Sequence, residues 1–340
     1  MEPEEADFTV LPKDPLSYDY AVILPFESGY NMRNATRWMQ QNWTQSIGVA
    51  VIYVLVIFGL QHYMSFRKRF TLATPLIVWN TMLAAFSIFA AIRMYPEFVA
   101  SLGRGYGYSA CNNSYAQGIT LFWAWVFALS KIVELGDTIF IVLRKQQLMF
   151  LHWYHHITVM VYTWYSFQQH TASGRWFITM NVTVHAFMYS YYAVRAWGIK
   201  PAKWVPWTIT CMQLAQMCLG CAVNTYSYYV KLQGQRCDQS FANLYAGFVM
   251  YATYFVLFAH FFHSAYYTKT GKFAAGDTQT RQKRAVSMVE NGAKPLNSQS
   301  VSVANGFYYS GGAAQNFMVN NYSTVMSNGH VPENNNKKID

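Results

Sequence analysis

Long apolar runs alternate with short polar segments through most of this chain. A helix of about 20 apolar residues is long enough to cross the hydrocarbon core of a bilayer. Seven runs reach that length, at residues 46–66, 75–95, 118–142, 150–169, 177–197, 205–229 and 241–267. The pattern predicts an all-α integral membrane protein with seven transmembrane helices, rather than a globular core in water.

Composition supports this prediction and divides the chain into three parts. The 340 residues are 53% hydrophobic and 12% charged, whereas soluble domains carry about 25% charged residues. Mean hydropathy is only +0.07, because two polar ends dilute the apolar middle. We expect a lumenal segment at 1–45, a seven-helix membrane domain at 46–267, and a disordered cytosolic tail at 268–340 that is rich in Ser, Asn and Gly.

The positive charges fall between the apolar runs instead of forming one patch. They are densest after the first, third, fifth and seventh runs, at Arg67, Lys68, Arg69, Arg144, Lys145, Lys200, Lys203, Lys269 and Lys272. The positive-inside rule then predicts a lumenal N-terminus and a cytosolic C-terminus. Residues 1–45 have no early apolar run, so we expect no cleavable signal peptide. The net charge of +10 does not indicate a nucleic-acid partner, since no basic and aromatic binding module is recognisable.

Two cysteines and three sequons, headed by Asn34, Asn42 and Asn112, fall on the side predicted to be lumenal. Cys111 and Cys237 lie in the loops after the second and sixth runs. An oxidising lumen permits disulfides, so this pair is either bridged or present as two free thiols. Asn34 heads the sequon Asn34-Ala-Thr36 and is the candidate glycosylation site.

The third run contains three charged side chains that lipid would exclude. Lys131, Glu134 and Asp137 are spaced three residues apart, so a continuous helix would place them on one face. Each would cost about 2.5–3.5 kcal/mol if it were exposed to lipid at the bilayer centre. Their mixed signs indicate pairing inside the protein, either as a structural ion pair or as part of a functional site.

The next three runs carry further polar stripes. The fourth opens with three histidines within five residues, a density that ordinary packing does not explain and that suits nucleophilic or proton-transfer chemistry. In the fifth, His185 taken alone is as consistent with core packing as with catalysis, and the glutamines of the sixth also suit helix–helix contacts. The candidates are His152, His155, His156, Asn181, His185, Tyr189, Tyr192, Gln213 and Gln216.

Four motifs in order resemble one family. The sequence reads KIVELGDT at 131–138, HWYHH at 152–156, NVTVHAFMYSYY at 181–192 and TCMQLAQ at 210–216. Together they resemble the signature of the ELO family, the very-long-chain fatty acid elongases or 3-oxoacyl-CoA synthases. The residues around the HxxHH box are similar to the branch that extends saturated and monounsaturated long-chain acyl-CoA.

The resemblance implies both a fold and a reaction. The implied fold is an inverted barrel of the second to seventh helices around an acyl tunnel, with the first helix outside. The implied reaction condenses acyl-CoA with malonyl-CoA to give 3-oxoacyl-CoA, carbon dioxide and CoA, without a cofactor or metal. His155 is the implied nucleophile, passing through an acyl-imidazole.

Other candidate residues receive supporting roles under this resemblance. Hydrogen-bond donors in a dry site stabilise developing negative charge, and we assign that role to His152, His156, His185 and Asn181. Glu134 and Asp137 are candidates for orienting imidazoles. Candidates for the CoA phosphates are Lys131, Arg144 and Lys145.

The end of the chain suggests where the protein resides. Lys337 and Lys338 stand fourth and third from the C-terminus and resemble the dilysine retrieval signal of endoplasmic reticulum membrane proteins. The expected partners are the bilayer and the other enzymes of the elongation cycle, namely the ketoacyl-CoA reductase, the dehydratase and the enoyl-CoA reductase.

Two other functions have some support in the sequence. Membrane di-iron desaturases and hydroxylases also use HxxHH boxes, but they need about eight histidine ligands and this chain has one such box. A seven-helix receptor would match the helix count, but the buried charges beside the histidines do not suggest ligand sensing.

Overall fold

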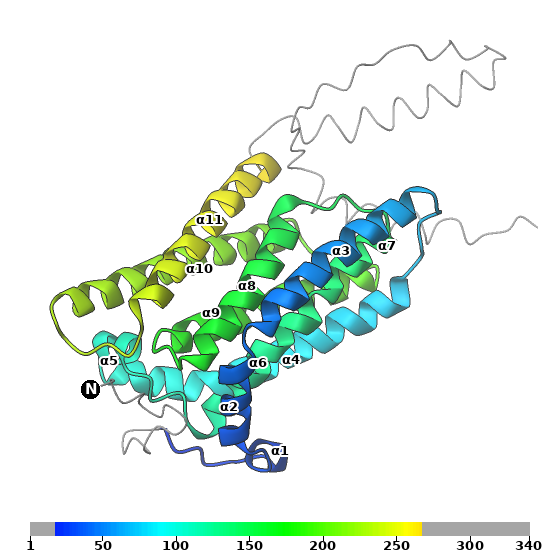
Figure 1. Ribbon diagram of the computed structural model, residues 1–340. Coiled ribbons are helices and arrows are strands. Elements are labelled where there is room, and N and C mark those ends of the chain that lie inside the picture. Colours follow the sequence, from blue (N-terminus) through cyan, green and yellow to red (C-terminus); the bar gives the residue numbers. More distant parts are fainter. Residues whose placement is uncertain (1–17, 267–340) are drawn as a thin grey trace, which may run out of the picture. The chain divides into compact units, whose positions relative to one another are not determined.

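The computed structural model describes residues 18–266 and is helical throughout its regular elements. The chain divides into two units, residues 1–257 and residues 258–340, and the last helix crosses this boundary. The helices are α1 (Pro25–Ser28), α2 (Met32–Asn42), α3 (Gln45–Ser65), α4 (Ala73–Gly103), α5 (Tyr106–Cys111), α6 (Gly118–Glu134), α7 (Gly136–Leu143), α8 (Phe150–Gln168), α9 (Gly174–Ala196), α10 (Trp204–Leu232) and α11 (Phe241–Tyr266) (Figure 1).

Each apolar run of the sequence is helical, but one of them is interrupted. The third run forms two helices, α6 and α7, which are joined at Leu135. The junction is a tight turn, in which the Leu135 N–H donates to the Ile132 carbonyl at 3.2 Å and the Thr138 N–H donates to the Leu135 carbonyl at 3.3 Å. The expectation of one continuous helix over 118–142 was therefore wrong, and glycine at 136, a poor helix former, lies at the break.

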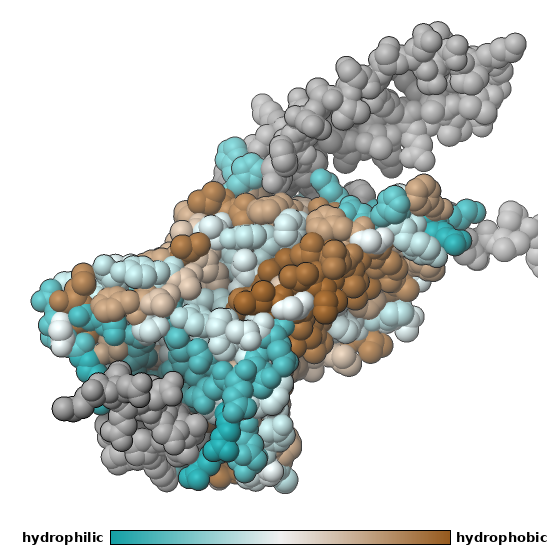
Figure 2. Space-filling model, viewed as in Figure 1, coloured by the Kyte–Doolittle hydropathy of each residue, from teal (hydrophilic) through white to brown (hydrophobic). Residues whose placement is uncertain are grey.

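Three described helices are long and apolar enough to cross a bilayer: α3, α4 and the Phe241–Ser264 part of α11. The other runs do not meet these requirements of length and hydropathy. Helices α6 and α7 are too short, and α8 to α10 contain many polar residues. The structure is thus all-helical, with several apolar helices compatible with a membrane protein. The outward side of α3 is strongly apolar, with Val51, Ile52 and Leu55 exposed, and Figure 2 shows hydrophobic side chains gathered over this helix.

Helix packing brings the polar stripes of the middle helices together. The most extensive helix–helix packing joins α4 and α9, and α6 packs on α8, while α3 packs on α7 and α8 (Figure 1). Aromatic and aliphatic side chains of α6 form much of the core, including Phe122, Trp123 and Phe127. These contacts place α6 beside α8, and a hydrogen bond from Lys131 to Asn181 links α6 to α9.

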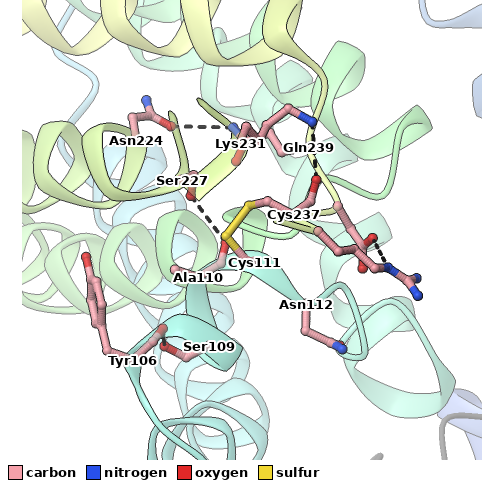
Figure 3. Close-up of a disulfide and its surroundings, with 12 residues drawn as sticks. Tyr106, Ser109, Ala110, Cys111, Asn112, Asn224, Ser227, Lys231, Cys237 and Gln239 are labelled. Atoms are coloured by element: carbon pink, nitrogen blue, oxygen red, sulfur yellow. Dashed lines mark hydrogen bonds and ion pairs between the residues drawn. A yellow bond between two sulfur atoms is a disulfide. The ribbon is translucent and has the colours of Figure 1, made fainter. Parts of the chain in front are cut away.

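One end of the helix assembly is fastened by covalent and ionic links. Cys111 and Cys237 form a disulfide, the bridged alternative of the sequence analysis (Figure 3). Beside it, the fully buried guanidinium of Arg175 pairs with Glu97 at 2.7 Å and donates to the Ser109 carbonyl at 2.8 Å. This end is therefore rigidly cross-linked between α4, α5, α9 and the loop before α11.

Candidate active site

A buried ionic network joins α6 to α9. The Lys131 ammonium lies 2.8 Å from Oε1 of Glu134 and donates to Oδ1 of Asn181, also at 2.8 Å. Ser130 donates to the same Glu134 oxygen at 3.1 Å. The other Glu134 oxygen makes no hydrogen bond and lies 3.7 Å from Nδ1 of His185. Lys131 and Glu134 therefore pair as the sequence predicted, and their pair contacts the amide and imidazole stripe of α9.

Asp137 does not join that network. Its Oδ1 accepts from the indole of Trp79 at 2.6 Å, and its Oδ2 accepts from the hydroxyl of Tyr189 at 2.8 Å. The break after Glu134 explains the difference, because Asp137 belongs to α7 and no longer follows the α6 register. The hydrogen-bond partners of Asp137 are therefore an indole and a phenol, and no imidazole is among them.

The break depends on a close approach at Gly136. A Cβ atom on this residue would lie 2.6 Å from two ring carbons of Trp79. The glycine lets the indole reach Asp137, and the ring also packs against Phe140 with centroids 5.5 Å apart. One missing side chain therefore fixes the position of a buried carboxylate.

The histidine box occupies the first two turns of α8. Nε2 of His152 lies 3.0 Å from the hydroxyl of Thr138, which in turn lies 2.6 Å from the hydroxyl of Tyr53. The His152 and His156 rings lie 4.5 Å apart, and Nδ1 of His156 has no hydrogen-bond partner. The sequence placed these two rings on one face, and the structure agrees.

His155 faces a different element from its two neighbours. Its ring lies 4.9 Å from that of Tyr254 on α11, and the Tyr254 hydroxyl donates to the His155 carbonyl at 3.2 Å. On the same helix, the Thr158 hydroxyl lies 2.6 Å from the Tyr254 hydroxyl. The α11 tyrosine thus anchors the turn that carries His155.

An internal cavity of about 60 Å³ is lined by several of the candidates. His155, Asn181 and Gln216 line it, on α8, α9 and α10. Away from them the lining is mostly apolar and aromatic, with Ala124, Phe127, Val159, Phe167, Phe177, Ile178, Met217 and Met250. The lining also includes the hydroxyl-bearing residues Tyr115, Tyr162, Thr163, Ser166, Tyr251 and Tyr254. A cavity lined by both polar and apolar side chains suits a molecule with a reactive polar end and a hydrocarbon body.

The remaining candidates on α9 and α10 surround this region without lining the cavity. Gln213 donates to the sulfur of Met188 at 3.6 Å. Tyr192 packs against the buried cluster of Leu83, Ala84 and Tyr189. These contacts suit a supporting role for Gln213, Tyr189 and Tyr192.

The three cations expected to bind CoA phosphates lie in different surroundings. Lys131 is 1% exposed and held by Glu134 and Asn181, so its ammonium is committed to the interior network. Lys145 is exposed, and its ammonium donates to the Ser65 carbonyl at 3.3 Å and the Arg67 carbonyl at 3.1 Å. Arg144 is half-buried beside it. A phosphate role for Lys131 is therefore not supported, while Arg144 and Lys145 lie near the C-terminal end of α3.

Sequence reasoning missed several residues of the site. Tyr53 reaches it from α3, Trp79 from α4 and Tyr254 from α11, and Thr138 stands between Tyr53 and His152. Aromatic residues are common in membrane helices, so they gave no signal. Only Thr138 belonged to a motif that was identified.

Other predicted features lie near or beyond the ends of the described residues, 18–266. Asn34 is exposed in the first turn of α2, where its N–H donates to Oδ1 of Asn31 at 3.2 Å. Lys337, Lys338 and the tail 268–340 lie outside the described residues. Within residues 18–266, no three His, Cys, Asp or Glu side chains gather as they would around a metal ion.

Comparison with known proteins agrees with the motifs. The GNS1/SUR4 family, ELO, matches residues 38–274. Putative fatty acid elongase 3 of Caenorhabditis elegans is 49% identical over 268 residues, covering 78% of this chain and 84% of the relative. Very long chain fatty acid elongase 6 of Drosophila melanogaster is 46% identical over 286 residues, covering 82% and 88%.

A human relative gives the same result. Very long chain fatty acid elongase 6 of Homo sapiens is 47% identical over 249 residues, covering 73% of this chain and 94% of the relative. The matched segment contains every histidine, amide and charged residue of the site described above. This chain belongs to the ELO family of fatty acid elongases.

Proposed function

We propose that this protein is a 3-oxoacyl-CoA synthase that condenses long-chain acyl-CoA with malonyl-CoA. The observation that carries the proposal is the cavity whose wall holds His155 and Asn181 and whose remaining lining is largely apolar. Family membership supports the same reaction, because its relatives are named fatty acid elongases. The products are 3-oxoacyl-CoA, carbon dioxide and CoA.

The first half-reaction transfers the acyl group to the protein. A ring nitrogen of His155 attacks the thioester carbonyl, and a C–N bond replaces the C–S bond as CoA leaves as its thiol with the imidazole proton. A neutral imidazole is a competent nucleophile and a thiol is a good leaving group. The acyl carbonyl then lies at the cavity, whose apolar lining includes Phe127, Phe167 and Phe177.

The second half-reaction forms the carbon–carbon bond. Malonyl-CoA loses carbon dioxide, and the electron pair of the broken bond forms an enolate of acetyl-CoA. The enolate carbon attacks the acyl-imidazole carbonyl, and the C–N electron pair returns to His155, whose ring nitrogen takes up one proton from solvent to restore the neutral imidazole. The reaction balances without an added oxidant, reductant or cofactor.

Negative charge develops on the carbonyl oxygen in both half-reactions, and the site contains hydrogen-bond donors that can stabilise it. The Asn181 amide lies 3.3 Å from the Nε2 of His185 and takes part in the Lys131 network. Preorganised donors of this kind stabilise an oxyanion in a dry site. We assign Asn181 and His185 to stabilising the oxyanion. His152 and His156 lie together on another face of α8, where their rings are 4.5 Å apart.

The membrane arrangement is part of the proposal. The seven apolar runs cross the bilayer, and the second to seventh enclose the acyl tunnel as an inverted barrel. The chain resides in the endoplasmic reticulum membrane with a lumenal N-terminus, which suits the disulfide between Cys111 and Cys237 and a glycan on Asn34. Its products pass to the reductases and the dehydratase of the elongation cycle.

Purified full-length protein incubated with labelled malonyl-CoA and an acyl-CoA tests this function. We expect label in 3-oxoacyl-CoA, with palmitoyl-, stearoyl- and oleoyl-CoA accepted better than arachidonoyl-CoA. Failure to incorporate label with any acyl-CoA would contradict the proposal, whereas a preference for the polyunsaturated substrate would overturn only the assignment to the saturated and monounsaturated branch.

A further inference from the structure

Arg195 is a buried cation without an acceptor in the part of the chain that the structure describes. It lies in the last turn of α9, its side chain is largely hidden with 5% of the residue exposed, and its Nε makes no hydrogen bond. The other buried cations, Lys131 and Arg175, are paired with Glu134 and Glu97. Buried charges are normally compensated, because an unpaired one loses its hydration without replacement.

No carboxylate of the helical region is free to compensate Arg195. Residues 46–257 contain four acids, and each has a partner elsewhere. Glu97 binds Arg175, Glu134 binds Lys131, Asp137 binds Trp79 and Tyr189, and Asp238 binds Arg236. The hundred residues between Asp137 and Asp238 contain none, while Lys200 and Lys203 follow Arg195 within eight positions. The counter-charge therefore has to come from outside this part of the chain.

The position of Arg195 on α9 connects it with the site. Asn181, His185, Met188, Tyr192 and Arg195 follow one another at steps of four, three, four and three, which keeps them on one side of a helix. At 1.5 Å per residue, Arg195 lies about 15 Å along the helix axis from His185. An anion that contacts both the reaction centre and Arg195 must therefore be separated from its reactive end by about that length.

A CoA thioester has this length between its sulfur and its diphosphate. The pantetheine arm joins the two through roughly 13 bonds, which span about 15 Å when the rise is about 3.5 Å per three bonds, as in an extended polypeptide. The carboxylate of malonyl-CoA lies only a few bonds from the thioester and would fall far short. The spacing favours the diphosphate over the malonyl group.

We propose that Arg195 binds the diphosphate of the CoA thioester and so sets how far the pantetheine arm enters toward the histidines. The inference rests on the proposed condensation and assigns a binding residue that the sequence analysis did not single out. The planar guanidinium of arginine forms paired hydrogen bonds with phosphate oxygens, and such charge-assisted bonds are among the strongest that proteins make.

Substrates with and without the diphosphate test this assignment. Condensation is measured with palmitoyl-CoA and with palmitoyl-pantetheine at the same saturating malonyl-CoA, so that the second substrate is common to both arms. In Arg195→Met, the ratio of kcat/KM for palmitoyl-CoA to that for palmitoyl-pantetheine should fall by about 10- to 100-fold, the loss expected for a hydrogen-bonded charge. Arg195→Lys should recover part of the ratio, because it restores the charge without the paired geometry.

Ligand-induced stabilisation gives a second readout that does not depend on turnover. CoA should raise the Tm of wild-type protein and of Lys68→Met, an exposed cation at the end of α3, but not that of Arg195→Met. An unchanged substrate ratio together with a retained CoA shift in Arg195→Met would overturn the inference. A wild-type protein that condenses no acyl-CoA would instead contradict the proposed function.

Nine acids lie outside the described residues, five in residues 1–17 and four in residues 267–340. Under the proposed topology only the four tail acids are on the cytosolic side, where α9 ends, so they are the internal alternative to be tested. The variant in which Asp277, Glu290, Glu333 and Asp340 become the corresponding amides separates the two explanations. Unchanged CoA stabilisation and substrate ratio in this variant are expected. A clear change of the substrate ratio or of the CoA-induced Tm shift in this variant would show that the tail acids pair with Arg195, and would overturn the assignment.

Discussion

Buried charge is the most informative feature at the scale of single residues. Lys131, Glu134 and the histidines were readable from sequence because a membrane helix excludes such groups unless they are used. Tyr53, Trp79 and Tyr254 were not, since nothing in an aromatic residue distinguishes a hydrogen-bonded role from packing. Sequence therefore predicts the charged part of the site and misses the aromatic part that positions it.

Removing one partner of the Lys131–Glu134 pair should be far more damaging than removing both. Glu134→Gln leaves a buried ammonium with only the Asn181 carbonyl oxygen and neutral contacts, and we expect a loss of about 3–5 kcal/mol. The double variant Lys131→Met with Glu134→Gln should lose clearly less than the sum of its single variants. Unfolding of the detergent-solubilised variants by heat measures this difference.

The exposed pair of Arg236 and Asp238 is the matched control. The Arg236 side chain is 86% exposed at 3.0 Å from the Asp238 carboxylate, so breaking that pair should cost about 0–1 kcal/mol. Additive losses at Lys131 and Glu134, of the size seen at Arg236, would show that the interior pair is not energetically coupled.

At the scale of helices, the break between α6 and α7 is what the sequence did not predict. Residues three apart share a face only while the helix continues, and the tight turn at Leu135 ended that register. The apolar pattern through 118–142 is uninterrupted, so periodicity alone had no reason to divide it. Two features accompany the break: glycine at 136 is a poor helix former, and the Trp79 ring packs where its side chain would be.

Gly136→Ala should disturb that break. The new Cβ would lie 2.6 Å from the Trp79 ring, so the indole must shift and weaken its bond to Asp137. We expect a loss of about 1–3 kcal/mol, as for other overpacked sites, together with reduced condensation. Thermal unfolding and activity of the variant measure both effects.

Gly48→Ala in α3 is the control for helix propensity. Nothing lies within 4 Å of its Cβ position, so this change should be neutral or stabilise by up to about 1 kcal/mol. Equal behaviour of the two variants would remove the role assigned to Gly136.

The segment before α2 is held by a carboxylate whose titration can be followed. Burial alone would raise the pKa of Glu27, but hydrogen bonds from the Trp123 indole, the Leu24 N–H and the Arg93 guanidinium outweigh it and lower the pKa below 4.5. A carboxyl with a lowered folded pKa contributes stability that is present above the unfolded value and lost as pH falls through the folded one.

Acidification should therefore protonate Glu27 and break its contacts only below about pH 4.5. Hydrogen exchange of residues 18–28 should accelerate there in the wild-type protein, with the exchange of α9 as the internal reference. Glu27→Gln should exchange faster already at neutral pH and lose this pH dependence. An identical pH profile in both proteins would contradict the role of Glu27.

At the scale of the whole molecule, the sequence predicted the family, the helical class and the order of the motifs. It also predicted that the stripes of the middle helices meet, and the network from Lys131 to His185 agrees. It did not reveal which helices supply the aromatic supports or where the cavity closes, because these depend on packing between segments far apart in the chain. The number of membrane crossings stays a prediction, as three described helices meet the length and hydropathy standard.

The disulfide links parts of the chain 126 residues apart and should matter for the assembly as a whole. Replacing Cys111 and Cys237 with serine should cost about 2–4 kcal/mol, chiefly by releasing the unfolded chain from a long loop. Wild-type protein should lose thermal stability in reductant. Cys218 is an exposed free cysteine, so Cys218→Ser is the control and should lose thermal stability in reductant to the same extent. A double serine variant as stable as oxidised wild type would contradict this expectation.

Capture of the acyl-enzyme tests most directly whether the histidine box opens the thioester. Full-length protein is mixed with palmitoyl-CoA without malonyl-CoA, and its intact mass is compared with those of His155→Ala and of His62→Ala, an exposed histidine of α3. We predict a palmitoyl adduct on wild type and His62→Ala that disappears when malonyl-CoA is added, and neither adduct nor condensation in His155→Ala. An adduct that persists in folded His155→Ala would place the nucleophile on another residue and contradict the mechanism.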